Sequence, residues 1–224
     1  MIKTKKPLLP PKAKRTFFDY FKMTVEAPEI IQSFGYSYEA SHLSLPRAGV
    51  EAKRLQELRE RLDLGQTIVT QSNEIARRKF LIAPVLLEAA ARARARISVE
   101  YPLEVDNQLR GTLDYFLRGE NTLLVVEAKN ADLERGFAQL SVELIALDKW
   151  LAAQPAVLHG AVSIGNIWQF GLLNRRSKRI TQDLALYRSP EDLAELLGAV
   201  IAILTNAGKA KRKSAGASSS KNGK

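Results

Sequence analysis

Residues 109–129, LRGTLDYFLRGENTLLVVEAK, decide the fold that the sequence predicts. The stretch is typical of two β-strands, 109–117 and 122–128, joined by a short Gly-Glu-Asn turn. The continuous apolar run LLVV indicates a central strand that is covered on both faces. This strand leads into Glu127 and Lys129, two charged residues that a buried strand rarely carries on one face without a reason. We therefore expect a sheet whose chemistry lies where this strand ends.

The patterns around this hairpin predict an α/β protein with a central mixed sheet flanked by helices. Helices are expected over 49–64, 72–95 and 132–151 and from Ser189 to about Thr205, and further strands over 97–105, 156–164, 167–173 and 179–187. Gly65 is expected to end the first helix, and Pro84 to kink the second or split it in two. Ser189 and Pro190 are expected to begin the last helix, and the strand 179–187 is expected at a sheet edge.

The charge of the 224-residue chain is concentrated at its two ends. The formal net charge is +10. Residues 1–15 and 207–224 contain twelve of the 34 Lys and Arg residues and no acidic residue, so the body between them is slightly negative. We expect a basic disordered arm over 1–15, an accessory helical region over 16–71, the main domain over 72–206 and a basic disordered tail over 207–224. The two ends either hold a polyanion weakly or serve only as solubilising segments.

Composition excludes several kinds of chemistry. The chain has no cysteine and only two histidines, so thiolate sites, disulfides, cysteine nucleophiles and multi-histidine zinc sites are excluded. A bound metal would need carboxylate ligands, and no motif for a small-molecule cofactor is present. The N-terminus has no long apolar stretch and no run is long enough to span a membrane, so we expect a cytoplasmic protein without a membrane segment.

Three charged residues of the hairpin are expected to converge. Glu127 and Lys129 are two apart on one strand and share a face, and Asp114 lies on the neighbouring strand. Close carboxylates repel each other unless a cation lies between them, and an all-oxygen site suits Mg²⁺, with Mn²⁺ as a substitute. Such a site can hydrolyse phosphodiesters, because the metal activates water and the lysine stabilises charge on the phosphate.

The motifs GxxDY at 111–115 and VVEAK at 125–129, followed by Gln139, resemble the restriction-endonuclease-like PD-(D/E)xK nucleases. Within that superfamily the chain is most similar to small bacterial and cyanobacterial proteins related to the N-terminal nuclease domain of type I restriction enzyme motor subunits. The resemblance runs from about Asn73 to about Tyr187 and implies a restriction-endonuclease-like fold.

The resemblance also implies roles for five residues: Asp114 and Glu127 as metal carboxylates, Lys129 as the catalytic lysine, Gln139 as an active-site support and Glu74 as an auxiliary metal ligand. Leu113 stands where the family's motif has its nominal proline. Other interpretations stay open. Glu74 would otherwise lie on a solvated helix face, with Glu88 as a rival ligand, and Gln139 and Glu143 would form an ordinary polar stripe.

A basic cluster lies in a predicted hairpin turn: Arg175, Arg176, Lys178 and Arg179. These side chains either contact a DNA backbone or form a solubilising turn that protects a sheet edge.

The function that we expect is a Mg²⁺-dependent DNA endonuclease. One alternative is a catalytically inactive module of the same fold that binds nucleic acid or a protein partner, which the slightly negative body favours. Another is an interaction protein in which Glu127 and Lys129 are only a surface salt pair. Cutting both DNA strands would need a homodimer or two sequential nicks.

Overall fold

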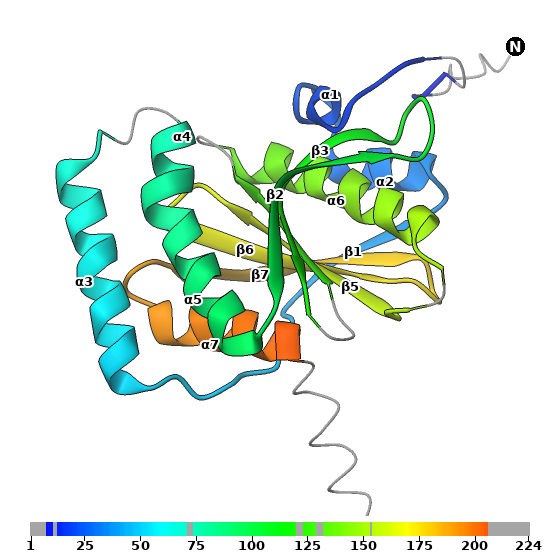
Figure 1. The fold of residues 1–224 in the computed structure, drawn as a ribbon. Helices are drawn as coiled ribbons and strands as arrows, with labels where there is room; N and C mark the ends of the chain where they lie inside the picture. Colours follow the sequence, from blue (N-terminus) through cyan, green and yellow to red (C-terminus); the bar gives the residue numbers. More distant parts are fainter. Residues whose placement is uncertain are drawn as a thin grey trace, which may run out of the picture.

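A computed structural model describes residues 8–10, 13–70, 74–119, 123–128, 132–152 and 154–205. It is an α/β protein in which helices cover both faces of a mixed sheet (Figure 1). The strands are β1 (Ser37–Ser41), β2 (Arg96–Glu104), β3 (Arg110–Arg118), β4 (Leu123–Ala128), β5 (Val157–Ser163), β6 (Ile167–Asn174) and β7 (Arg179–Arg188). The helices are α1 (Phe17–Phe21), α2 (Ala27–Ser33), α3 (Ala52–Ile68), α4 (Glu74–Arg77), the π-helical η1 (Arg78–Ile82), α5 (Ala83–Ala93), α6 (Leu133–Trp150) and α7 (Leu193–Thr205).

The described strands form one sheet in the order β1-β7-β6-β5-β4-β3-β2. Neighbours are antiparallel within β2-β3-β4 and within β5-β6-β7. The parallel pairs are β4 with β5 and β1 with β7. Helix α6 joins β4 to β5, because parallel neighbours need a crossover connection. The mixed sheet expected from the sequence is thereby confirmed.

Helix α6 is buried continuously from Gly136 to Leu147, because the sheet covers one side of it and α1 and α2 cover the other (Figure 1). Two strand glycines allow α6 to approach closely. A Cβ atom on Gly160 would lie 2.8 Å from Cδ1 of Leu140, and one on Gly171 would lie 2.6 Å from Cε2 of Phe137. Side chains at these two positions would push the helix off the sheet.

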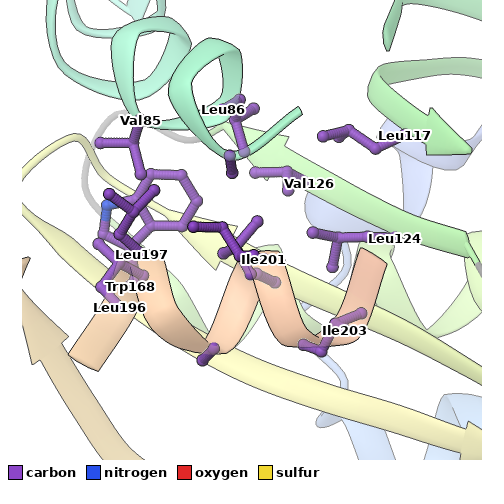
Figure 2. Close-up of a cluster of buried hydrophobic side chains, with 14 of the residues drawn as sticks. Val85, Leu86, Leu117, Leu124, Val126, Trp168, Leu196, Leu197, Ile201 and Ile203 are labelled. Carbon is purple, nitrogen blue, oxygen red and sulfur yellow. The ribbon is translucent and has the colours of Figure 1, made fainter. Parts of the chain in front are cut away.

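The opposite face of the sheet is covered by α3, α5 and α7. Figure 2 shows Trp168 of β6 beside Val85 of α5 and Leu196 and Leu197 of α7, in a buried cluster that also contains Leu124 and Val126 of β4. Both of these β4 residues are fully buried. The LLVV run is therefore apolar because β4 lies in the middle of the sheet between two helical layers.

Several boundaries differ from the expected ones. Gly65 does not end a helix but lies buried within α3, where a Cβ atom would lie 3.1 Å from the carbonyl oxygen of Phe80. Because Gly65 has no side chain, α3 can pack closely against η1 at this position. Helix α7 begins at Leu193 and not at Pro190, because Asp192 first closes a turn by accepting a hydrogen bond from the backbone N–H of Arg188 at 2.9 Å. The break expected at Pro84 is present as the π-helical segment before α5.

The N-terminal part contributes to the sheet as well as to the helical layers. Strand β1 pairs with β7, so β7 is an interior strand and β1 is the edge; the expected edge position of 179–187 is wrong. Within 1–15, the described residues 8–10 and 13–15 are ordered against the β2–β3 turn. Gln108 donates a hydrogen bond to the Pro10 carbonyl at 2.6 Å, and Leu9 is buried. The rest of the expected arm and the expected tail over 207–224 lie outside the described residues.

In the part of the chain that the structure describes, no helix has the length and apolar character needed to cross a bilayer.

One buried histidine gives the fold a pH dependence. His159 lies on β5 between β4 and β6, and burial lowers the pKa of its imidazole from 6.5 to about 4. The folded protein keeps this ring neutral, whereas the unfolded chain binds a proton below pH 6.5. His159 therefore disfavours folding increasingly as the pH falls from 6.5 to about 4.

We predict that the free energy of unfolding of the wild type falls by up to about 3 kcal/mol from this cause over that range, and that His159→Gln lacks this loss. Urea denaturation at a series of pH values measures the difference. His42→Gln is the matched control, because His42 is an exposed histidine. Parallel pH profiles for the wild type and His159→Gln would contradict the assignment.

Candidate functional site

Two of the expected site residues follow the last pair of the β3–β4 ladder. Tyr115 pairs with Val126 and Phe116 with Val125. The next residue along each strand beyond Tyr115–Val126, the last pair, is Asp114 on β3 and Glu127 on β4. Glu127 also pairs with Val162 of β5, one residue before the end of β4. A carboxylate-bearing residue therefore follows the last β3–β4 pair on each strand, at the carboxyl end of the central strand.

Strand β3 is irregular at Asp114. The β2–β3 ladder pairs Val99 with Tyr115 and Tyr101 with Leu113, but no Glu100–Asp114 pair forms between them. Glu100 has a φ of 52°, a left-handed conformation that is uncommon for a residue other than glycine. The interruption changes which way the side chains point, because Leu113 packs with the α6 side of the sheet whereas Tyr115 packs with the α5 side.

Asp114 lies beside an arginine that the sequence did not single out. One guanidinium nitrogen of Arg78 is 3.5 Å from Oδ1 of Asp114, and another is 3.5 Å from Glu100. The side chains of Arg78 and Asp114 are 16% and 15% exposed. Burial opposes the charge of Arg78, but Asp114, Tyr115 and Glu100 together outweigh it, so the pKa of Arg78 lies above its ordinary value. The sequence showed Arg78 only as one base in a helical stretch, with no motif to link it to β3.

Tyr115 connects β3 to the same helical turn. Its hydroxyl donates a hydrogen bond of 3.0 Å to the carbonyl oxygen of Arg78, and the Arg78 guanidinium lies 5.5 Å from the centre of its ring. Burial raises the pKa of Tyr115, so the hydroxyl remains a donor. Asp114 and Tyr115, the DY pair of the sequence motif, therefore both contact Arg78 of η1.

Glu74 is the first residue of α4, which the structure anchors at the same edge of the sheet. Arg77 donates a hydrogen bond of 3.3 Å to the Ile164 carbonyl, directly after β5, and its Cβ lies 3.4 Å from where a Cβ on Gly165 would be. Since β4 and β5 are parallel, their carboxyl ends lie together, and α4 begins near them. The rival Glu88 pairs with Arg92 on α5 at 3.1 Å, more than two turns further along the helical run. Glu74 therefore lies nearer to the carboxyl ends of β4 and β5 than Glu88 does.

Helix α6 carries a buried polar pair. Nε2 of Gln139 donates a hydrogen bond of 2.8 Å to Oε1 of Glu143, and the two residues are 3% and 0% exposed. An ordinary surface stripe is therefore ruled out, and Arg135, which would extend such a stripe, is exposed beside Asp132. A buried carboxylate is costly unless it is paired or hydrogen-bonded. The sequence analysis assigned a functional role only to Gln139. Glu143 could have been found as its partner, because it lies four residues further along the same apolar helix.

The rest of the expected triad lies beyond what the structure describes. This applies to all of Lys129 and to the side chain of Glu127. Among the described residues, no group of three His, Cys, Asp or Glu side chains forms a set of metal ligands. The donors at this edge of the sheet are carboxylates, and hard oxygen donors of this kind fit Mg²⁺ better than a soft metal.

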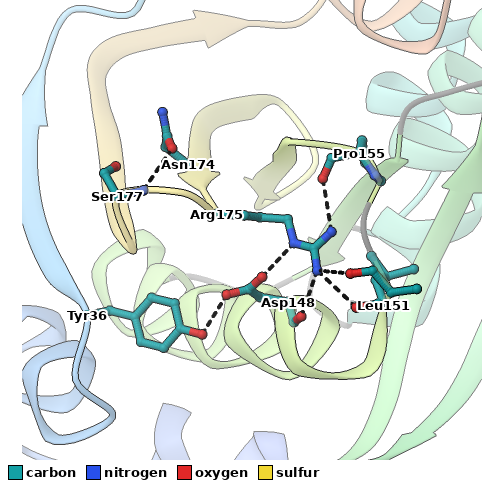
Figure 3. A network of polar contacts seen from close by, with 8 residues as sticks. Tyr36, Asp148, Leu151, Pro155, Asn174, Arg175 and Ser177 are labelled. Carbon is teal, nitrogen blue, oxygen red and sulfur yellow. Dashed lines mark hydrogen bonds and ion pairs between the residues drawn. The ribbon is translucent and has the colours of Figure 1, made fainter.

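The expected basic cluster divides into two parts. Arg175 faces inward, where its guanidinium bonds Asp148 at 2.5 Å and the carbonyl oxygens of Leu151 and Pro155 (Figure 3). Asp148 also accepts a hydrogen bond of 2.7 Å from Tyr36. Arg175 thus closes the carboxyl end of α6 and is not a DNA-contacting side chain, because free carbonyls at a helix end need donors.

The other three bases are exposed, but they lie far from Asp114. Arg176, Lys178 and Arg179 surround the β6–β7 turn. Strand β6 runs from the level of Ser163, near the carboxyl end of β4, to Asn174 at the opposite end of the sheet. Six residues of strand separate these levels by about 20 Å. The structure therefore does not join this cluster to the carboxylate site.

A groove of about 620 Å³ lies between β1, β7 and the start of α6. A chain of hydrogen bonds crosses its floor, from Tyr38 to Gln182 at 2.7 Å and from Gln182 to Gln169 at 3.1 Å. Glu26 and Glu134 line it together with Arg135. Two acidic side chains against one base make this groove a poor receptor for a phosphate backbone.

No protein-family model and no curated protein sequence matches this chain. The class that the structure defines is an α/β protein with a mixed sheet.

We predict that Arg175→Ala lowers the free energy of unfolding by about 2 kcal/mol or more, because Asp148 and the end of α6 lose their donors. Arg176→Ala is the matched control and changes stability by less than about 0.5 kcal/mol. Urea denaturation measures both. Equal stabilities of the two variants would mean that the Arg175 network does not hold α6.

Proposed function

We propose that this chain is a metal-dependent DNA endonuclease with a restriction-endonuclease-like fold, in which Asp114 and Glu127 bind Mg²⁺ and Lys129 acts on the phosphate. The observation that carries the proposal is the β3–β4 register, whose last pair, Tyr115–Val126, is followed on the two strands by Asp114 and Glu127. A buried strand that ends beside a second carboxylate is costly unless a cation balances the charge.

The order of elements supports the same proposal. Helix α5, the antiparallel strands β2, β3 and β4, helix α6 and the parallel strand β5 follow one another along the chain. This central mixed sheet with helices on both faces is the arrangement that the resemblance to PD-(D/E)xK nucleases implies. The start of α4 near the carboxyl ends of β4 and β5 supports Glu74 as a further ligand.

The proposed chemistry is hydrolysis without any change of oxidation state. A bound Mg²⁺ would polarise the phosphoryl group and lower the pKa of a water molecule. Asp114 and Glu127 would hold the ion, and the Lys129 ammonium would orient the attacking water or stabilise charge on the phosphate. A bond forms from the water oxygen to phosphorus, the bond to one ester oxygen breaks, and that oxygen takes up a proton. Gln139 would support the site from α6 through its bond to Glu143.

A binding module without turnover is the second candidate. The Arg78–Asp114 ion pair favours it, since Asp114 already has a positive partner without any metal. The negative net charge of the body and the distance of the basic turn from Asp114 point the same way. Such a module would bind nucleic acid or a protein partner.

The test is nicking of supercoiled plasmid by the purified protein with Mg²⁺, Mn²⁺ or EDTA. We predict metal-dependent nicking that falls at least about 100-fold in Lys129→Ala, since charge stabilisation at the phosphate is lost. Lys53→Ala is the matched control, because Lys53 is an exposed lysine of α3.

Nicking that persists in EDTA, or that is equal in Lys129→Ala and the wild type, would refute the proposal. Linear product that appears together with nicked circles would indicate that a homodimer cuts both strands, whereas slow conversion of nicked circles would indicate sequential nicks.

A further inference from the structure

Arg78 is fixed in place by its own backbone. Pro84 has no N–H, so it cannot donate the α-helical hydrogen bond to Phe80. The chain forms a π-helical turn instead, in which the N–H of Ala83 donates to the Arg78 carbonyl. The hydroxyl of Tyr115 donates to the same carbonyl at 3.0 Å. Single π-helical turns within a helix occur frequently at functional sites, and this turn projects Arg78 toward β3.

The Arg78 guanidinium is held near Asp114 by loose contacts. Its ion pairs with Asp114 and Glu100 are both 3.5 Å long. A tight charge-assisted hydrogen bond between such groups measures about 2.8 Å. Glu100 is 68% exposed, so its pairing is weakened by water. A guanidinium has five N–H donors, and two long ion pairs do not use them fully.

We propose that Arg78 binds the DNA phosphate at this site and competes with the metal ion for Asp114. This inference rests on the proposed function. Without metal, Arg78 balances the charge of Asp114. When a divalent cation binds Asp114, the ion pair weakens and the guanidinium turns to the phosphodiester, whose oxygens match its planar fork of donors. The exchange keeps the carboxylate neutralised in both states.

Two measurements then move in opposite directions when Arg78 is lost. Metal binding becomes tighter, because a competing positive charge has been removed from Asp114. DNA binding and nicking become weaker, because a phosphate contact has been removed. A merely structural role would weaken all three together, since a disordered η1 would also disturb Asp114 and Tyr115.

The experiment compares the wild type with Arg78→Met and Arg78→Lys. Mn²⁺ affinity is measured by calorimetry, DNA affinity by anisotropy of a fluorescent duplex in Ca²⁺, and activity by plasmid nicking. For Arg78→Met we expect Mn²⁺ affinity to rise about threefold and nicking to fall about 100-fold. Arg78→Lys keeps the positive charge but lacks the planar fork of donors. Its Mn²⁺ affinity, DNA affinity and nicking are expected to lie between those of the wild type and Arg78→Met. The matched control Arg92→Met, an arginine paired with Glu88 on α5, behaves as the wild type.

The outcomes separate this inference from the proposed function. If the wild type binds Mn²⁺ and nicks DNA, but Arg78→Met binds Mn²⁺ more weakly or nicks equally well, the role of Arg78 is overturned and the nuclease stands. If the wild type neither binds Mn²⁺ nor nicks DNA, the proposed function and the role of Arg78 both fail.

Discussion

The parallel pairing of β4 with β5 is the constraint on which the rest of the structure depends. Parallel neighbours require a crossover, and here α6 makes it, buried between the sheet and the short helices α1 and α2. Gly160 and Gly171 allow this helix to lie close to β5 and β6. The pairing also brings the carboxyl ends of β4 and β5 to one edge, so that α4 and β3 can present charged side chains there.

That edge concentrates charge in a place where burial makes charge costly. Asp114 is offset there by Arg78; away from the edge, in the middle of α6, Glu143 lies fully buried next to Gln139. Replacing such groups by apolar ones often leaves a fold equally stable, so their presence indicates a use beyond stability. The divalent cation that we propose between Asp114 and Glu127 would account for the carboxylates. Arg78 would then have a partner both with and without that cation.

Most of the sheet could be predicted from the sequence because strand and helix periodicities differ strongly. The hairpin of β3 and β4, the α6 crossover and the following hairpin were found nearly at their observed boundaries. Predictions from local sequence were wrong where contacts with distant parts of the chain determine the structure. Gly65 serves contact with η1 inside a helix, and β7 is interior because β1, far away in sequence, pairs with it. The β3–β4 pairing followed from the short turn, whereas Arg78 was missed because its contact with β3 depends on the helix being packed there.

The most direct test of the shared carboxylate site is the electron paramagnetic resonance of Mn²⁺ titrated into the wild type and into Asp114→Asn and Glu127→Gln. The account predicts a bound Mn²⁺ ion in the wild type that each single substitution displaces, with Mg²⁺ competing for it. Binding that survives both substitutions would contradict a cation held between these two residues, as would a wild type that binds no Mn²⁺.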